Sequence, residues 1–308
     1  MTKRPMLFVN EGKAAYPDVA ACMDYFRARF DVRDVAPAIA AAMPDIGRAI
    51  CWHMMGLYPK RLDCALTIHD YRSLSVGRGR KLKDIVKRVT NARPDIRLFQ
   101  NDAIRRALRF TQDDRTRFLA MGVPMQFINE RRLAELPTSD FVYIGSMLAE
   151  RRCERMLDSF ISRFGTAKRF DLYGPRNAAL EQRYRGWGNI QFHGLIAQSE
   201  LPRKLKAARV GVAFFPDHYP HVLQTPTKLM EYAALGMRVL ANEHPQSRLT
   251  AAQYGLTCQW GSIDDLFAAV SDALDWDDNM AVDPAPMAWP AVIAASKVDE
   301  LIKRLLPD

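Results

Sequence analysis

The chain has 308 residues, of which 48% are hydrophobic and 26% are charged, which is ordinary for a globular protein. At roughly 100–200 residues per domain, this length favours two domains. The sequence contains no apolar run near the roughly 20 residues that cross a bilayer, which argues against a membrane-spanning helix.

The N-terminal residues and the cysteines indicate a cytoplasmic protein. The apolar stretch at residues 6–9 is too short for the core of a secretion signal. The five cysteines are scattered, odd in number and without metal-ligand spacing. We therefore expect reduced thiols, with neither a disulfide framework nor a zinc site.

The net charge of +9 is unevenly distributed along the chain. Residues 1–133 contain 25 Lys and Arg against 14 Asp and Glu, whereas residues 134–308 contain 19 against 21. Much of the excess lies between residues 72 and 109. A one-sided basic surface indicates an anionic partner, such as a membrane leaflet, a phosphorylated lipid or nucleic acid. A solvated surface helix is an equally weighted alternative.

In the first half, short apolar runs alternate with stretches of helical periodicity. Strands are expected at residues 6–10, 30–35, 48–54, 64–69, 96–100 and 125–128. Helices are expected at residues 18–30, 81–90 and 115–121. This alternation implies a parallel sheet with helices on its faces.

After a polar stretch around Pro137 the same pattern restarts. Strands are expected at residues 141–144, 170–173, 190–193, 210–215, 238–241 and 256–260. Helices are expected at residues 149–164, 201–208, 225–235, 262–276 and 291–306, the fourth with a capping-box-like start at Ser262 and Asp265. The predicted fold class is α/β, with two Rossmann-like doubly wound domains at 1–133 and 140–285 and a C-terminal helix within 286–308. In such sheets, ligands bind beyond the carboxyl ends of the strands.

The most informative segment is residues 225–236, TPTKLMEYAALG. Thr225 is suited to cap a helix and Pro226 to occupy its first position. A helix N-terminus with Lys228 in its first turn is suited to phosphate. Glu231 lies three residues later on the same face, where its carboxylate can accept hydrogen bonds from ribose hydroxyls. The spacing indicates a nucleoside diphosphate; a capped helix with a Lys–Glu surface pair is the alternative.

Residues 225–242 resemble the donor-site segment of GT-B glycosyltransferases, especially bacterial polysaccharide and lipid-linked glycan transferases. The similarity continues upstream in FVYIGS, FDLYGP, NIQFHGLI and VGVAFFP, in the family's order, and covers nearly all of residues 140–260. The resemblance implies a GT-B fold with two domains facing a cleft, and a C-terminal helix that crosses back onto the N-terminal domain. It also implies a glycosyltransferase that uses a nucleotide-sugar as substrate and no cofactor or metal.

The resemblance implies a donor site assembled from several strand ends. Lys228 and the N–H groups near Thr227 would hold the diphosphate, and Glu231 would bind the ribose. The other implied donor-site residues, which approach the diphosphate, the base or the wall of the cleft, are Gly145, Ser146, Arg151, Tyr173, Gly194, Leu195, Ile196 and Thr225. UDP is the first choice among nucleotides because the resembled enzymes mostly use it.

Two departures from the family bear on the stereochemistry. Leu223 stands where many retaining members have a first glutamate, and no Lys-Gly pair follows Arg151 and Arg152. These departures favour an inverting enzyme of the glucuronosyltransferase-like branch.

Inverting transfer needs a general base that deprotonates the acceptor hydroxyl. We expect Asp70 in the segment TIHD to be this base, with Glu11 or His69 next. The alternative is that Asp70 caps a turn and His69 packs. The basic stretch that follows suits electrostatic docking on the inner leaflet of the cytoplasmic membrane, where a lipid-linked acceptor would lie.

Two other functions stay open at the level of sequence. A sugar-nucleotide epimerase or hydrolase would use the same donor site without an acceptor. A non-catalytic nucleotide-binding or nucleic-acid-binding protein would use the basic first half. No nucleic-acid partner is expected, because the sequence has neither a stacked-aromatic RNA motif nor a helix-turn-helix signature.

Overall fold

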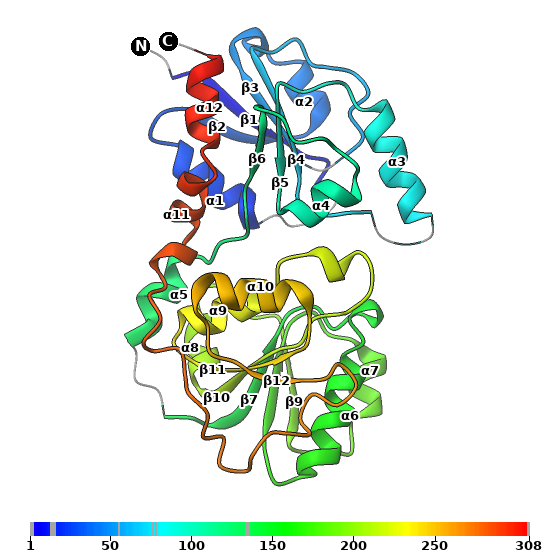
Figure 1. Ribbon diagram of the computed structural model, residues 1–308, viewed down its shortest axis with the longest axis vertical. Coiled ribbons are helices and arrows are strands. Elements are labelled where there is room, and N and C mark those ends of the chain that lie inside the picture. The colour runs from blue at the N-terminus through cyan, green and yellow to red at the C-terminus, as the bar shows by residue number, and fades with distance from the viewer. Residues whose placement is uncertain are drawn as a thin grey trace. The chain divides into compact units, whose positions relative to one another are not determined.

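A computed structural model describes residues 3–12, 17–54, 56–75, 77, 79–132 and 136–306. The chain forms two compact units (Figure 1). Unit 1 comprises Met1–Gly122 and Trp289–Asp308, and unit 2 comprises Val123–Ala288. The division after Gly122 lies ahead of the polar stretch that marks a boundary in the sequence.

Unit 1 is built on a six-stranded parallel sheet with the order β2-β1-β3-β4-β5-β6. Its strands are β1 (Pro5–Val9), β2 (Asp31–Val35), β3 (Ile50–Met54), β4 (Leu66–Tyr71), β5 (Ile96–Phe99) and β6 (Thr116–Phe118). Its helices are α1 (Pro17–Phe26), α2 (Pro37–Ala41), α3 (Arg80–Thr90), α4 (Asp102–Ala107), α11 (Trp289–Ala295) and α12 (Val298–Leu305), with a short 3₁₀ turn η1 (Ile46–Arg48). Every residue of β1, β3 and β4 is buried, as expected for a parallel sheet covered on both faces.

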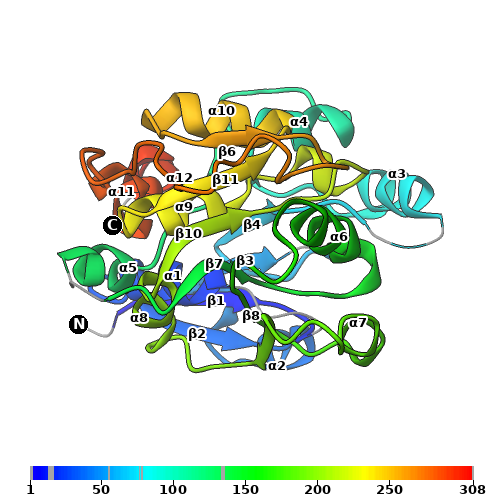
Figure 2. The same cartoon turned by 90° about the horizontal axis from the view of Figure 1, so that it is seen from below.

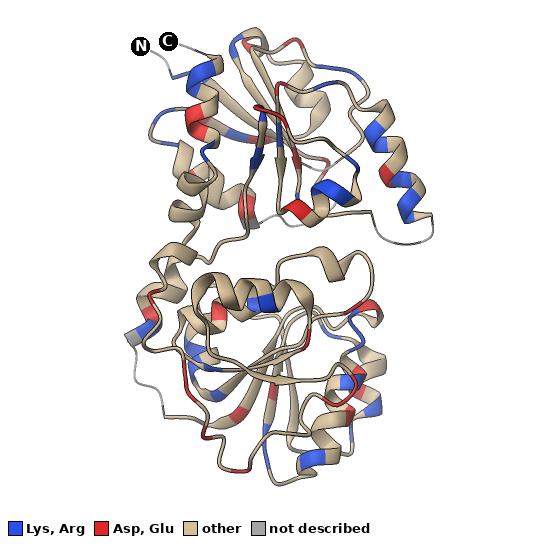
Figure 3. Cartoon of the chain, viewed as in Figure 1, with Lys and Arg blue, Asp and Glu red and all other residues tan. Residues whose placement is uncertain are grey.

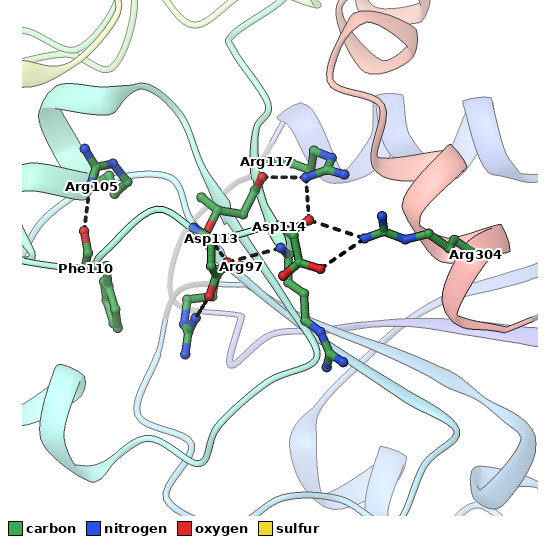
Figure 4. A network of polar contacts seen from close by, with 9 residues as sticks. Arg97, Arg105, Phe110, Asp113, Asp114, Arg117 and Arg304 are labelled. Carbon is green, nitrogen blue, oxygen red and sulfur yellow. Dashed lines mark hydrogen bonds and ion pairs between the residues drawn. The ribbon is translucent and has the colours of Figure 1, made fainter.

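The C-terminal helices complete the core of unit 1. Trp289 and Ile293 of α11 and Ile302 of α12 pack in one cluster with Phe8 and Trp52 from the sheet. A polar network also ties α12 to the end of the sheet (Figure 4), where Arg304 Nη2 lies 3.6 Å from Asp114 Oδ2. Residues nearly 300 positions apart in sequence therefore share one core.

Unit 2 is built on a second six-stranded parallel sheet, in the order β12-β11-β10-β7-β8-β9. Its strands are β7 (Ser139–Ile144), β8 (Phe170–Tyr173), β9 (Ile190–Gly194), β10 (Ala208–Ala213), β11 (Arg238–Asn242) and β12 (Gln259–Gly261). Its helices are α5 (Met125–Asn129), α6 (Cys153–Phe164), α7 (Ala178–Arg183), α8 (Leu201–Lys206), α9 (Thr227–Ala234) and α10 (Pro245–Tyr254). Its 3₁₀ turns are η2 (Glu130–Arg132), η3 (Ala149–Arg151), η4 (His221–Leu223) and η5 (Ala285–Met287).

The strand order of unit 2, read from β9, is the doubly wound order of dinucleotide-binding folds. The chain reverses direction across the sheet between β7 and β10, so the carboxyl ends of these two strands mark the expected ligand position. In unit 1 the corresponding switch lies between β1 and β3.

Two short segments were predicted with the wrong secondary structure. Residues 115–121, expected as a helix, contain the edge strand β6, which pairs with β5. Residues 125–128, expected as a strand, lie in α5, whose Phe127 packs beneath α9 in the core of unit 2. Short apolar runs fit either structure, and here tertiary contacts decide between them.

The helix expected at residues 262–276 does not form. Ser262 Oγ does accept the predicted capping bond from the Asp265 N–H, at 2.9 Å. The Phe267 N–H, however, donates to Ser159 Oγ at 2.9 Å, and Arg163 Nε donates to the Val270 carbonyl at 3.0 Å. Side chains of α6 thus take backbone groups that a helix would use.

The last predicted helix is in fact two helices. Lys297 adopts a left-handed conformation with φ of 55°, which separates α11 from α12. The Ser296 hydroxyl donates to the Ile293 carbonyl at 2.6 Å and so closes α11 at this point. Helix α10 was not predicted, because its polar residues give little helical periodicity.

Candidate functional site

A cavity of about 300 Å³ opens at the carboxyl edge of the unit 2 sheet. Its walls come from the ends of β7 and β8, the segment after β9, and the first turns of α8 and α9. The lining residues are Ile144, Gly145, Tyr173, Gly174, Pro175, Leu195, Ile196, Leu201, Thr227, Lys228 and Glu231. Seven residues of the predicted donor site therefore lie around one cavity.

Two glycine turns form one side of this cavity. Gly145 has a φ of 129° and Gly174 a φ of 150°, a region that disfavours other residues. A Cβ on Gly145 would lie 2.5 Å from Lys228 Cε, and one on Gly174 would lie 2.0 Å from the Gly145 carbonyl oxygen. Glycine at position 145 lets the Lys228 side chain rest against the backbone, and glycine at position 174 lets the two turns lie against each other.

Helix α9 begins two residues later than predicted. It starts at Thr227, and Pro226, which has no hydrogen-bonding side chain, occupies the cap position instead of Thr225. The first N–H groups of a helix have no intrahelical acceptors, so this end of α9 suits an anion. The helix is held in place because the Ile144 N–H donates to Tyr232 Oη at 3.0 Å.

Two cations lie beside each other at this helix end. The Lys228 ammonium lies 5.8 Å and the Arg151 guanidinium 5.6 Å from the centre of the Phe215 ring. Arg151 Nε and Nη1 are buried and have no hydrogen-bond partner among the described residues. Burial, reinforced by the Arg151 charge, lowers the pKa of Lys228. Like charges with unused donors call for an anion between them.

Glu231 lies one helical turn further along α9 and also lines the cavity. Burial raises the pKa of Glu231, and the Lys228 charge opposes this shift. On the opposite wall, Tyr173 stacks on His193 with 4.6 Å between ring centres. His193 Nε2 lies 2.9 Å from Asp171 Oδ1, so the imidazole is held by a carboxylate beside the cavity wall.

Four predicted donor-site residues do not line this cavity: Ser146, Arg151, Gly194 and Thr225. Arg151 nonetheless lies near the cavity, because its guanidinium shares the Phe215 ring with Lys228, which lines the cavity. The Gly194 carbonyl accepts a hydrogen bond from the Gly174 N–H at 2.9 Å and supports the second glycine turn. Ser146 accepts the Leu148 N–H at 3.3 Å through its Oγ, which orders the segment leading to Arg151.

Sequence reasoning missed Phe215, the ring under both cations. It lies in the quoted segment VGVAFFP, just beyond β10, and was counted only as part of a strand. Its position after the strand was the available signal. Gly174 and Pro175 were likewise quoted within FDLYGP but not assigned to the site, although both line the cavity.

In unit 1, Asp70 is part of a buried network of polar contacts. Strand β4 continues to Tyr71, so Asp70 lies within the strand and not after it, and it is 2% exposed. Its carboxylate accepts from Trp52 Nε1 at 3.0 Å and lies 3.3 Å from Arg72 Nε. Burial raises the pKa of Asp70 to about 6, against the effect of Arg72. The Asp70 carboxylate is therefore enclosed by polar neighbours within unit 1.

His69 is also buried, on the other face of the same strand. Burial, with a contribution from the neighbouring His53, lowers the pKa of His69 to about 3, and the two rings lie 5.3 Å apart. Glu11, by contrast, is exposed just beyond β1. There the Gly12 N–H donates to Asn10 Oδ1 at 2.7 Å and forms a tight turn around it. Glu11 is the one predicted catalytic residue at the surface.

Two kinds of feature are absent from the described ranges. No helix there is long and apolar enough to cross a membrane. The same residues contain no group of three or more His, Cys, Asp or Glu side chains arranged to hold a metal ion.

Comparison with known proteins identifies the fold. No family model matches the chain, and no curated protein matches it. Among solved structures, a glycosyltransferase from Rickettsia africae is similar over 100% of both chains, with 10% identity and a TM-score of 0.66. Sucrose-phosphate synthase from Thermosynechococcus elongatus matches over 98% of this chain and 99% of its own, with 14% identity and a TM-score of 0.66.

A third similar structure is HepE from Anabaena in complex with UDP and glucose. It matches over 98% of this chain and 100% of its own, with 9% identity and a TM-score of 0.64. The similarity extends over both units in all three cases. The chain therefore has the GT-B fold, with two Rossmann-like α/β units, as the sequence predicted.

Proposed function

We propose that the chain is a glycosyltransferase that binds a nucleotide-sugar donor in unit 2 and its acceptor on unit 1. The observation that carries this proposal is the pair Arg151 and Lys228 at the open end of α9, with Glu231 one turn away. Two unpaired cations and free N–H groups suit a diphosphate, and the carboxylate suits ribose hydroxyls. The HepE structure contains UDP, which favours uridine as the base.

In the proposed reaction, the acceptor oxygen attacks the anomeric carbon of the donor sugar. The bond from this carbon to the diphosphate oxygen breaks, and the acceptor proton passes to a base. Negative charge grows on the leaving diphosphate, where Lys228, Arg151 and the N-terminus of α9 stabilise it. We propose an inverting outcome without a metal, with protein cations supplying this charge.

For the base we propose Glu11. It is exposed and lies beyond the carboxyl end of β1, at the switch between β1 and β3 where ligands of such sheets bind. Glu11→Gln should lower kcat by about 100-fold or more and leave UDP affinity unchanged. Glu300→Gln, an exposed position of the same unit, is the matched control. Near-normal turnover by Glu11→Gln would rule this base out.

The acceptor we propose is a glycan or lipid-linked glycan of bacterial surface polysaccharide synthesis. One of the similar structures is a lipopolysaccharide outer core galactosyltransferase, WaaB, with 10% identity and a TM-score of 0.57. The basic first half of the chain supports contact with an anionic inner leaflet, where such acceptors are presented. The proposed location is the cytoplasm, at the face of the cytoplasmic membrane.

The first test is thermal-shift binding of UDP, GDP and TDP to the wild type and to Glu231→Ala. A nucleotide that binds the native state raises its melting temperature. At a nucleotide concentration of 100 times Kd, binding adds about 2.7 kcal/mol to the free energy of unfolding. We expect UDP to stabilise the wild type and to lose most of this effect in a folded Glu231→Ala variant. If none of the three nucleotides stabilised the protein, the proposed donor site would be refuted. Free or epimerised sugar released without acceptor would indicate a hydrolase or epimerase instead.

A further inference from the structure

Helix α3 has its polar side toward the protein and its apolar side toward solvent. Its buried residue is Asp84, which is 5% exposed and accepts a hydrogen bond from the Ser75 N–H at 2.9 Å. The large apolar side chains of the helix are exposed instead: Leu82 64%, Ile85 50%, Val86 40% and Val89 75%. This is the reverse of a helix that packs on a core.

The four apolar residues form one continuous stripe. Their spacing is i, i+3, i+4 and i+7, so they lie on a single face of the helix. With 11 residues, α3 is about 16 Å long, and the stripe runs along most of it. The helix lies at the periphery of unit 1 in both views (Figure 1 and Figure 2).

Positive charge borders the apolar stripe. The basic residues of the helix are Arg80, Lys81, Lys83, Lys87 and Arg88, and Figure 3 shows their density on α3. Lys81, Lys83 and Arg88 are exposed, whereas the one acidic residue, Asp84, is buried. To solvent, the helix therefore presents apolar side chains and cations without an exposed acid.

The combination of exposed apolar and cationic side chains on α3 indicates which kind of partner binds this face. Apolar side chains can enter the boundary between headgroups and acyl chains, while Lys and Arg reach back to lipid phosphates. A second copy of the chain would bring two cationic helices together, which like-charge repulsion opposes. Charge complementarity thus favours an anionic bilayer.

We propose that α3 lies in the surface of an anionic membrane, with Leu82, Ile85, Val86 and Val89 below the lipid phosphates. This deepens the proposed contact with the inner leaflet, and it rests on the proposed function only for which leaflet is bound. Binding itself requires neither donor nor acceptor. Because part of the attachment is apolar, part of it resists salt.

The test is co-sedimentation of the full chain with vesicles of phosphatidylcholine alone or mixed with phosphatidylglycerol. We expect binding to the anionic vesicles, with a fraction retained at high salt. Leu82→Ser with Val89→Ser should weaken partitioning by about tenfold or more. Lys81→Gln with Arg88→Gln should weaken it by at least about tenfold, selectively on anionic vesicles. Ile39→Ser removes an exposed apolar side chain of α2 in the same unit and is the matched control, with no effect expected.

Three results would overturn the proposal. The wild type could stay in the supernatant with anionic vesicles. The Leu82/Val89 variant could bind like the wild type while salt removes both, which would leave an electrostatic contact alone. Sedimentation velocity could show a dimer that the same variant dissociates, which would make the stripe a protein interface. UDP thermal shift on the same samples separates the two proposals: a retained shift without vesicle binding refutes only the role of α3.

Discussion

Each unit contains a cluster of three ionisable side chains taken at least partly out of water. The unit 1 charge cluster is Asp18, Asp70 and Arg72, and the unit 2 charge cluster is Arg151, Lys228 and Glu231. In unit 1, Arg72 lies between the two carboxylates, 2.8 Å from Asp18 and 3.3 Å from Asp70. It also donates through Nη1 to the carbonyls of Leu119 and Ala120, whereas its Nη2 has no hydrogen-bond partner among the described residues.

The unit 2 charge cluster is not ion-paired in this way. Its two cations share one aromatic ring, and Arg151 has buried donors without a partner in the described structure. Its carboxylate faces a cavity. Unused donors occur in both clusters, so the comparison shows that buried charge does not by itself indicate a ligand site, whereas charge that borders a cavity does.

The largest expected effect concerns the unit 1 charge cluster. Arg72→Met leaves two buried carboxylates without a cation and should lower the free energy of unfolding by about 3–5 kcal/mol. Urea unfolding followed by circular dichroism measures this loss. Arg106→Met, at an exposed position of α4, should stay within about 0.5 kcal/mol of the wild type. A small loss for Arg72→Met would mean that this cluster is not closed as described.

The next effect concerns the unit 2 charge cluster. Lys228→Met should weaken UDP binding by about 10- to 100-fold, because a charge-assisted hydrogen bond is worth roughly 1.5–3 kcal/mol. The free variant should be at least as stable as the wild type, since repulsion from Arg151 is relieved. Isothermal titration calorimetry and melting curves measure the two quantities, with Lys204→Met on the exposed face of α8 as control. If Lys228→Met were destabilised and bound UDP with unchanged affinity, Lys228 would be a structural residue and not a ligand of the diphosphate.

The smallest effect is on the pH dependence of binding. The pKa of Lys228 in the free protein is lowered to about 8, and a bound diphosphate should raise it by favouring the ammonium. Affinity is therefore full below about pH 8 and falls as pH rises through the pKa of the bound state, by at most about tenfold per pH unit. Lys228→Met should lack this alkaline fall. The same fall in that variant would place the titrating group elsewhere.

Much of the fold was predictable because its signals are local. Buried strands of parallel sheets are short apolar runs, and the residues just after them, such as Gly145, follow from the strand positions. The unit 2 cavity was predictable for the same reason, since Lys228 and Glu231 lie on one helix face at a strand end. Local spacing places these residues without knowledge of the rest of the chain.

The sequence-based predictions were incomplete where contacts with a segment distant in sequence determine the local structure or burial. Residues 262–276 contain a helix cap that forms, yet Ser159 of α6 takes a backbone N–H and the helix is lost. Asp70 is enclosed because Arg72 and Asp18 come together in the fold, and no spacing rule joins these positions. The exposed stripe of α3 has the sequence pattern of a packed helix, and only the structure shows which face is covered.

The position of α11 and α12 has a consequence for synthesis. Their residues complete the core of unit 1, but they leave the ribosome after the whole of Val123–Ala288. Until then Phe8 and Trp52 lack the covering side chains of Trp289 and Ile293. Unit 2 is one continuous stretch and can finish folding first. The part of the chain that is made earliest is thus the last to complete its core, and its apolar side chains stay exposed longest during translation.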